Sequence, residues 1–147
     1  MEDKFNENLP EPELITKSRR ILDIIQAVLI GFRVIIILFC VILSIIGEED
    51  MGGNVIKLII EIGVICFFLH IIKNGKKKIA ILPLLGGVIG LTSISEIFSL
   101  SDGSIILTLS SYCLVFMVFF QIASMLYILS SKKIEFYCHY VLYNKNN

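Results

Sequence analysis

Four long runs of apolar residues divide the chain, near positions 21–46, 54–72, 79–98 and 104–130. A helix of about 20 residues crosses the ~30 Å of hydrocarbon in a bilayer, and every run reaches or approaches that length. Strands are the alternative, because the runs are rich in β-branched residues. Unpaired strand edges cannot face lipid, however, and four strands are too few to close a barrel. The runs therefore predict four transmembrane helices.

The overall composition agrees with a membrane protein. Of the 147 residues, 56% are hydrophobic, which exceeds the usual level for soluble domains. Thirteen basic and thirteen acidic residues cancel, so no net field points to nucleic acid as a partner. The length suffices for one bundle and leaves no room for a separate soluble domain.

The charges between the runs predict the orientation of the chain. Basic residues fall before the first run, between the second and third, and after the fourth: Lys17, Arg19 and Arg20; Lys73, Lys76, Lys77 and Lys78; Lys132, Lys133 and Lys145. The other two connections contain acids and no Lys or Arg: Glu48, Glu49 and Asp50; Asp102. By the positive-inside rule, both termini are expected in the cytoplasm and the protein in the plasma membrane. Because the connections are short, the predicted fold is an all-α integral membrane protein, an antiparallel four-helix transmembrane bundle.

The segments outside the bundle are predicted to be short. Residues 1–20 are polar and contain Pro10 and Pro12, so they are expected to form a flexible cytoplasmic tail in front of the transmembrane domain at 21–130. Residues 131–147 are expected to be a cytoplasmic interfacial tail, as an amphipathic segment or an extension of the last helix. The abundance of isoleucine over alanine indicates an AT-rich genome and suggests a bacterial source.

Four charged residues lie inside the predicted spans: Arg33, Lys57, Glu61 and Glu96. A charge at mid-helix costs roughly 2.5 to 3.5 kcal/mol on insertion scales. Counting helical rise places Arg33 and Glu61 at similar depth, and Lys57 and Glu96 at similar depth. Lys57 and Glu61 are also i,i+4 neighbours. We therefore predict a ladder of ion pairs in the order Arg33–Glu61–Lys57–Glu96, with the second helix between the first and third.

This charge network has three interpretations. Buried polar groups can fix the register of helices without any other role. Intramembrane charges also mark sites for ions, protons or substrates. Lys57 and Glu96 could instead extend separately to the outer interface.

Small and polar residues suggest further contacts. Gly86 and Gly90 form a G-x-x-x-G pair, which allows a second helix to approach closely, within the bundle rather than between two chains. Ser110, Gln121 and Ser124 share one stripe of the fourth predicted helix. We favour a stripe that bonds to neighbouring helices, with a permeation lining as the alternative.

No enzymatic or metal-binding pattern stands out. Cys66–His70 and Cys138–His139 lack zinc-finger spacing, so we predict no metal site, no cofactor and unpaired thiols. Motifs of metalloproteases, hydrolases and phosphate-binding loops are missing, so we do not expect an enzyme.

The favoured function is that of an accessory, regulatory or immunity-type protein. It would act in the bilayer by contact with another membrane protein or by self-association, and short loops with self-neutralised charges suit that role. The alternative is a small oligomeric transporter or channel component that uses the intramembrane charges.

Overall fold

The computed structural model describes residues 11–46, 52–99 and 105–146, and these are helical almost throughout, with no strand among them. Four long helices precede a shorter one, and a 3₁₀ turn joins the second to the third. Their bounds are α1, Glu11–Ile46; α2, Gly52–Lys73; η1, Lys77–Ala80; α3, Ile81–Ser99; α4, Ile105–Ser130; and α5, Lys132–Asn146. The predicted runs match α1 to α4 to within a few residues, except at the start of α1.

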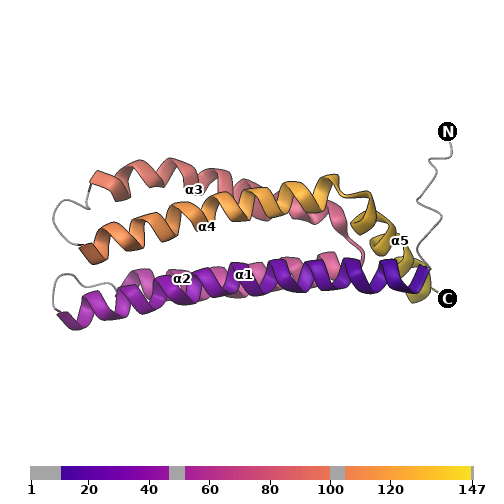
Figure 1. The fold of residues 1–147 in the computed structure, drawn as a ribbon, viewed down its shortest axis with the longest axis horizontal. Coiled ribbons are helices and arrows are strands. Elements are labelled where there is room, and N and C mark those ends of the chain that lie inside the picture. The colour runs from indigo at the N-terminus through magenta and orange to yellow at the C-terminus, as the bar shows by residue number, and fades with distance from the viewer. Residues whose placement is uncertain (1–10, 47–51, 100–104, 147) are drawn as a thin grey trace.

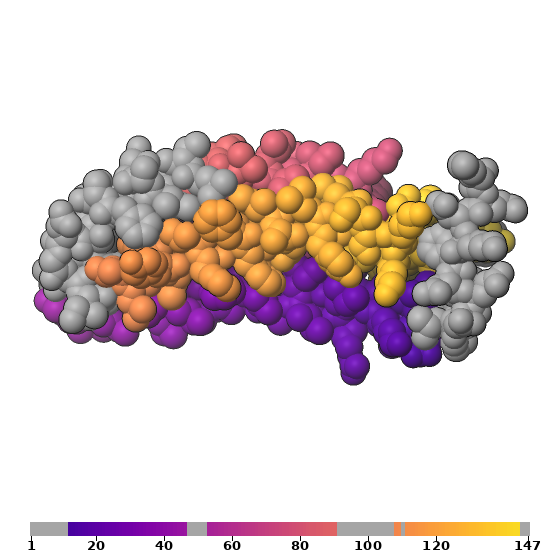
Figure 2. Space-filling model, turned by 45° about the horizontal axis from the view of Figure 1, so that its top comes forward, coloured from indigo at the N-terminus to yellow at the C-terminus, as the bar shows by residue number. Residues whose placement is uncertain are grey.

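The four long helices lie along one axis of an elongated molecule, and α5 lies at one end (Figure 1). Successive long helices run in opposite directions along that axis (Figure 1). Helix α1 packs against both α2 and α4, and α3 packs chiefly against α4. Figure 2 shows α4 between α3 and α1. The predicted order, with the second helix between the first and third, is therefore wrong, because α1 lies between α2 and α4, and α3 packs on the other side of α4.

Among the described residues, three helices are long and apolar enough to cross a membrane: Pro12–Ile46, Gly53–Lys73 and Ser111–Ser130. In α3, the side chains are described only as far as Gly90. Helices of this length and hydrophobicity suit a bilayer, because a helix satisfies its backbone hydrogen bonds internally.

Helix α1 has 36 residues and begins at Glu11, inside the segment predicted as a flexible tail. Pro12 suits a first helical turn, where its missing N–H costs nothing. Glu13 forms an ion pair with Lys17, with 2.7 Å between Oε1 and Nζ, which supports this exposed turn. The tail prediction is thus corrected for 11–20, while residues 1–10 lie outside the described part of the chain.

The buried apolar residues form two clusters along the bundle. The first cluster, near α5, draws on four helices, with members that include Leu22, Leu29, Leu69, Met125 and Ile134. The second lies toward the opposite end: Ile36, Cys40, Leu58, Met117 and Val118. In sequence, Arg33 falls between Leu29 and Ile36, and Gln121 falls between Val118 and Met125. A polar layer therefore separates the two apolar clusters.

Candidate functional site

The guanidinium group of Arg33 is the centre of this polar layer. The residue is only 2% exposed. Its Nη2 donates to Gln121 Oε1 at 2.7 Å, and its Nη1 donates to the Leu29 carbonyl at 3.1 Å. Its Nε lies 3.5 Å from Glu61 Oε2 as an ion pair, although Nε has no acceptor in hydrogen-bonding geometry among the described residues. A buried cation needs such charged and dipolar partners, because removal from water is costly.

Gln121 connects three helices through one amide group. It is 6% exposed on α4, and its oxygen accepts from Arg33 of α1. Its Nε2 donates to the Pro83 carbonyl of α3 at 2.7 Å. Both ends of the amide are therefore paired, which is the condition under which a buried amide stabilises a fold.

Glu61 is the accessible member of the polar layer. Its side chain is 37% exposed, against 3% for the side chain of Arg33. The structure thus brings together the central pair of the predicted ladder, with the anion at the edge of the bundle and the cation inside. Such a pair can hold α1 and α2 in register, and its carboxylate can also meet an ion or a second chain.

The outer part of the predicted ladder is different. Lys57 is exposed, and it forms no ion pair with Glu61 within the described residues. That rung of the prediction is wrong, because an i,i+4 spacing permits a contact without enforcing it. The side chain of Glu96 lies outside the described residues, so its pairing with Lys57 stays a prediction.

The small residues of α3 contact α4 at positions that differ from the predicted pair. A Cβ atom at Gly87 would lie 2.9 Å from Ile122 Cγ1, and one at Gly90 would lie 3.4 Å from Val118 Cγ2. At Gly86 the nearest atom would be 4.0 Å away, and Gly86 is exposed. The close approach therefore uses Gly87 and Gly90, and the sequence prediction missed Gly87 because the G-x-x-x-G pattern does not identify the contact face.

Two members of the predicted polar stripe are buried on α4. Gln121 belongs to the polar layer, and Ser124 lies one turn further along and is also buried. The side chain of Ser110 lies outside the described residues. The stripe thus faces the other helices where it is described.

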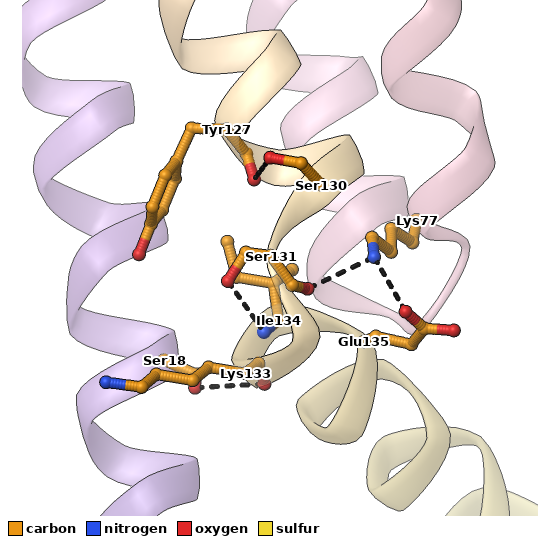
Figure 3. A network of polar contacts seen from close by, with 8 residues as sticks. All are labelled: Ser18, Lys77, Tyr127, Ser130, Ser131, Lys133, Ile134 and Glu135. Atoms are coloured by element: carbon orange, nitrogen blue, oxygen red, sulfur yellow. Dashed lines mark hydrogen bonds and ion pairs between the residues drawn. The ribbon is translucent and has the colours of Figure 1, made fainter. Parts of the chain in front are cut away.

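A second polar cluster joins α5 to the bundle (Figure 3). Ser131 separates α4 from α5, and its hydroxyl accepts from the Ile134 N–H at 3.4 Å, as an N-cap residue does. Lys77 donates to the Ser131 carbonyl and to Glu135 Oε2, each at 3.1 Å (Figure 3). The hydrogen bond from Lys77 to Glu135 and the charge of Lys77 lower the pKa of Glu135. On the other side, Ser18 of α1 donates to the Lys133 carbonyl at 3.2 Å (Figure 3).

The buried face of α5 rests on the end of α2. Tyr137 donates its hydroxyl hydrogen to the Lys73 carbonyl at 3.2 Å, and the Cys138 thiol donates to the Ile72 carbonyl at 3.5 Å. Burial raises the pKa of Cys138 to about 11. Gly75 has a φ of 97°, and a Cβ there would lie 2.5 Å from Leu142 Cγ. Segment 131–147 was predicted as an interfacial tail, and its described part is a helix docked on the bundle, with Tyr140 and Tyr143 left exposed. Its place at a membrane interface stays a prediction.

Metal-binding geometry is not found in the part of the chain that the structure describes. No group of three or more His, Cys, Asp or Glu residues comes together there. The four cysteines are free, and Cys40 and Cys138 are buried.

No protein-family model matches the chain, and no curated protein or solved structure was found to be similar to it. Its function is therefore inferred from the residues and their arrangement.

Proposed function

We propose that this chain is a four-helix integral membrane protein that acts as an accessory, regulatory or immunity-type protein through contacts within the bilayer. Helices α1 to α4 would each cross the plasma membrane of a bacterial cell, in antiparallel order. Both termini and α5 would lie on the cytoplasmic side. The partner would be another membrane protein or a second copy of the chain.

The observation that supports this role is the pairing of Arg33 inside its own chain. The buried guanidinium donates hydrogen bonds to Gln121 and the Leu29 carbonyl and forms an ion pair with Glu61, so its charge is compensated within the chain. Gln121 is in turn fixed by the Pro83 carbonyl. Hydrogen bonds and an ion pair of this kind can set the order and register of helices. The outward faces of the helices then remain for contacts with other proteins.

The distribution of charge supports the proposed orientation. The α5 end of the molecule contains the exposed cations Arg19, Arg20, Lys76 and Lys78. In the sequence, the connections between α1 and α2 and between α3 and α4 contain acids and no Lys or Arg. Basic residues are enriched on the cytoplasmic side of membrane proteins.

Accessibility of the polar layer tests the proposal. We would express a chain whose four cysteines are replaced by alanine and introduce Ser124→Cys, which changes one atom at a buried position. In intact cells and in membranes, a membrane-impermeant thiol reagent should leave Cys at position 124 unlabelled and should label Asn54→Cys, an exposed control near the start of α2. In parallel, the tagged wild-type chain purified in mild detergent should retain a partner in stoichiometric amount.

A transporter or channel component is the second candidate. It is favoured by one observation, the 37% exposure of the Glu61 side chain beside a buried Arg33 Nε that has no hydrogen-bond acceptor among the described residues. In that case Arg33, Glu61 and Gln121 would line a pathway. Labelling of position 124 to the level of position 54 would support this candidate and contradict the first.

A further inference from the structure

Helix α2 differs from the other long helices on its outward face. The outward residues of α1, α3 and α4 in the middle of the bundle are apolar wherever the structure describes them, for example Leu38, Leu85 and Phe119. On α2, Lys57 is exposed and Glu61 is partly exposed. They are one helical turn apart on the same side, about 6 Å along the axis. Charged groups that face hydrocarbon are costly, so this face calls for a polar partner.

Lys57 has no such partner among the described residues of its own chain. It forms no ion pair with another described residue, and Glu61 is directed to Arg33. Glu61 uses one carboxylate oxygen for that pair, and an ionised carboxylate offers acceptor sites on both oxygens. Within the described part of the chain, a cation without an ion pair and a carboxylate with a second oxygen to spare therefore lie side by side on the outside of α2.

The exposed residues around Lys57 follow the spacing of a helix–helix seam. They succeed one another at intervals of four, three, four and three residues, and all are exposed: Gly53, Lys57, Ile60, Val64 and Phe67. Apolar and small residues at this average interval of 3.5 suit two helices that pack side by side at a small angle. Gly53 has no atom within 4 Å of a built Cβ, so a second backbone can approach closely there.

We propose that this face of α2 binds the same face of a second copy of the chain. This proposal rests on the proposed function and names the partner. Two copies in one membrane share their orientation, so a twofold axis along the membrane normal relates them, and such an interface must be self-complementary. Lys57 and Glu61 meet that requirement, because Lys57 of each copy can reach Glu61 of the other. Glu61 then lies between Arg33 of its own chain and a lysine of the second chain.

Disulfide cross-linking tests the geometry of the interface. In the chain with its native cysteines replaced by alanine, Val64→Cys should form a covalent dimer when membranes are treated with an oxidant. Phe119→Cys, an equally outward position on α4, is the matched control and should stay monomeric. Equal cross-linking at both positions, or none at position 64, would overturn the proposal.

Charge substitution tests the chemistry of the interface. Lys57→Glu should weaken dimerisation about tenfold, measured by energy transfer between labelled chains diluted in lipid vesicles, because interhelical polar contacts have energies of this order. Lys57→Arg should retain the dimer. Because Lys57 is exposed and has no described ion pair, the far-UV spectrum should be unchanged in both variants.

The outcomes separate this inference from the proposed function. A monomer that still purifies with a different protein, or a Val64→Cys cross-link to such a protein, would overturn the dimer and leave the proposed function standing. A monomer whose position 124 reacts with the impermeant reagent would overturn both.

Discussion

Arg33 is the one charged residue that is buried among those described, so it needs polar partners inside the bundle. Removing one partner from a buried ion pair costs about 3 to 5 kcal/mol, because the remaining charge is left uncompensated. Depth along the helices was enough to predict Glu61 as a partner, since both residues lie near the middle of their spans. Depth could not identify Gln121 as a direct partner, because the sequence does not specify which helix faces which. Gln121 was instead placed in a stripe of unassigned contacts.

Gln121→Leu should lower the free energy of unfolding by about 1 to 3 kcal/mol. It removes the 2.7 Å bond from Arg33 and leaves the Pro83 carbonyl without the amide donor. Thermal or denaturant unfolding in detergent micelles measures the loss. The loss of stability in the double variant Arg33→Met with Gln121→Leu should be smaller than the sum of the losses in the two single variants, because neither side chain is then left without the other. Additive losses would show that the two side chains do not act as a unit.

The glycines of α3 make a matched pair for a packing test. Gly87→Ala should destabilise the protein by about 1 to 3 kcal/mol, because its Cβ would lie 2.9 Å from Ile122 Cγ1. Gly86→Ala should be neutral or stabilising by up to about 1 kcal/mol, because alanine is the better helix former and the nearest atom is 4.0 Å away. Unfolding midpoints in the same detergent compare the two. A larger loss of stability at Gly86 than at Gly87 would support the predicted G-x-x-x-G contact and contradict the packing of α3 on α4 in the structure.

At the level of elements, the apolar runs of the sequence predicted the long helices. Apolar runs of sufficient length specify helices in hydrocarbon, and the ends of α2, α3 and α4 follow from where those runs stop. The extension of α1 to Glu11 was missed because an amphipathic, charged turn outside the apolar run resembles a linker. The docking of α5 was missed because it depends on contacts distant in sequence, such as Ser18 with Lys133. Ser131 at its N-cap and Gly75 opposite Leu142 were the available local signals.

The docking of α5 on the turn after α2 can be tested at Gly75. Gly75→Ala should release α5, because φ is 97° and the new Cβ would lie 2.5 Å from Leu142 Cγ and 2.8 Å from the Cys138 carbonyl. Cys138 reports the release in a chain that keeps it as the one cysteine. Its labelling by a maleimide at pH 8 should be slow in the parent and at least several-fold faster in the variant. Gly31→Ala, where a Cβ meets nothing within 4 Å, should leave the rate unchanged, and equal rates in all three chains would contradict the docked helix.

The same thiol predicts how docking depends on pH. Burial raises its pKa from an ordinary value near 9 to about 11, so the docked state favours the protonated thiol. The contribution of Cys138 to docking is therefore complete below about pH 9 and is lost as the pH rises toward 11.

On the scale of the whole molecule, the described charged residues gather at the α5 end, apart from the polar layer around Arg33 and the exposed Lys57. The apolar length of the helices contains one described polar layer, built on Arg33, while the α5 end combines exposed cations with fixed pairs such as Lys77–Glu135 and Lys73–Asp23. Lys73 Nζ lies 2.6 Å from Asp23 Oδ1, which joins α2 to α1 at this end. A chain with this asymmetry has one favoured orientation in a membrane, because translocating the α5 end would require moving its clustered lysines and arginines across the hydrocarbon.

That asymmetry makes the topology directly testable. In the chain without native cysteines, Gly53→Cys at the start of α2 and Asn144→Cys near the end of α5 are exposed positions at opposite ends of the molecule. An impermeant maleimide added to intact cells should label position 53 and leave position 144 unlabelled, and both should react once the cells are broken. Charge reversal at the exposed lysines, Lys76→Glu with Lys78→Glu, should raise the labelling of position 144 in intact cells, because it weakens the basic bias while leaving the paired Lys73 and Lys77 in place. Labelling of position 144 in the unmodified chain would place α5 outside the cell and contradict the orientation on which the proposed contacts depend.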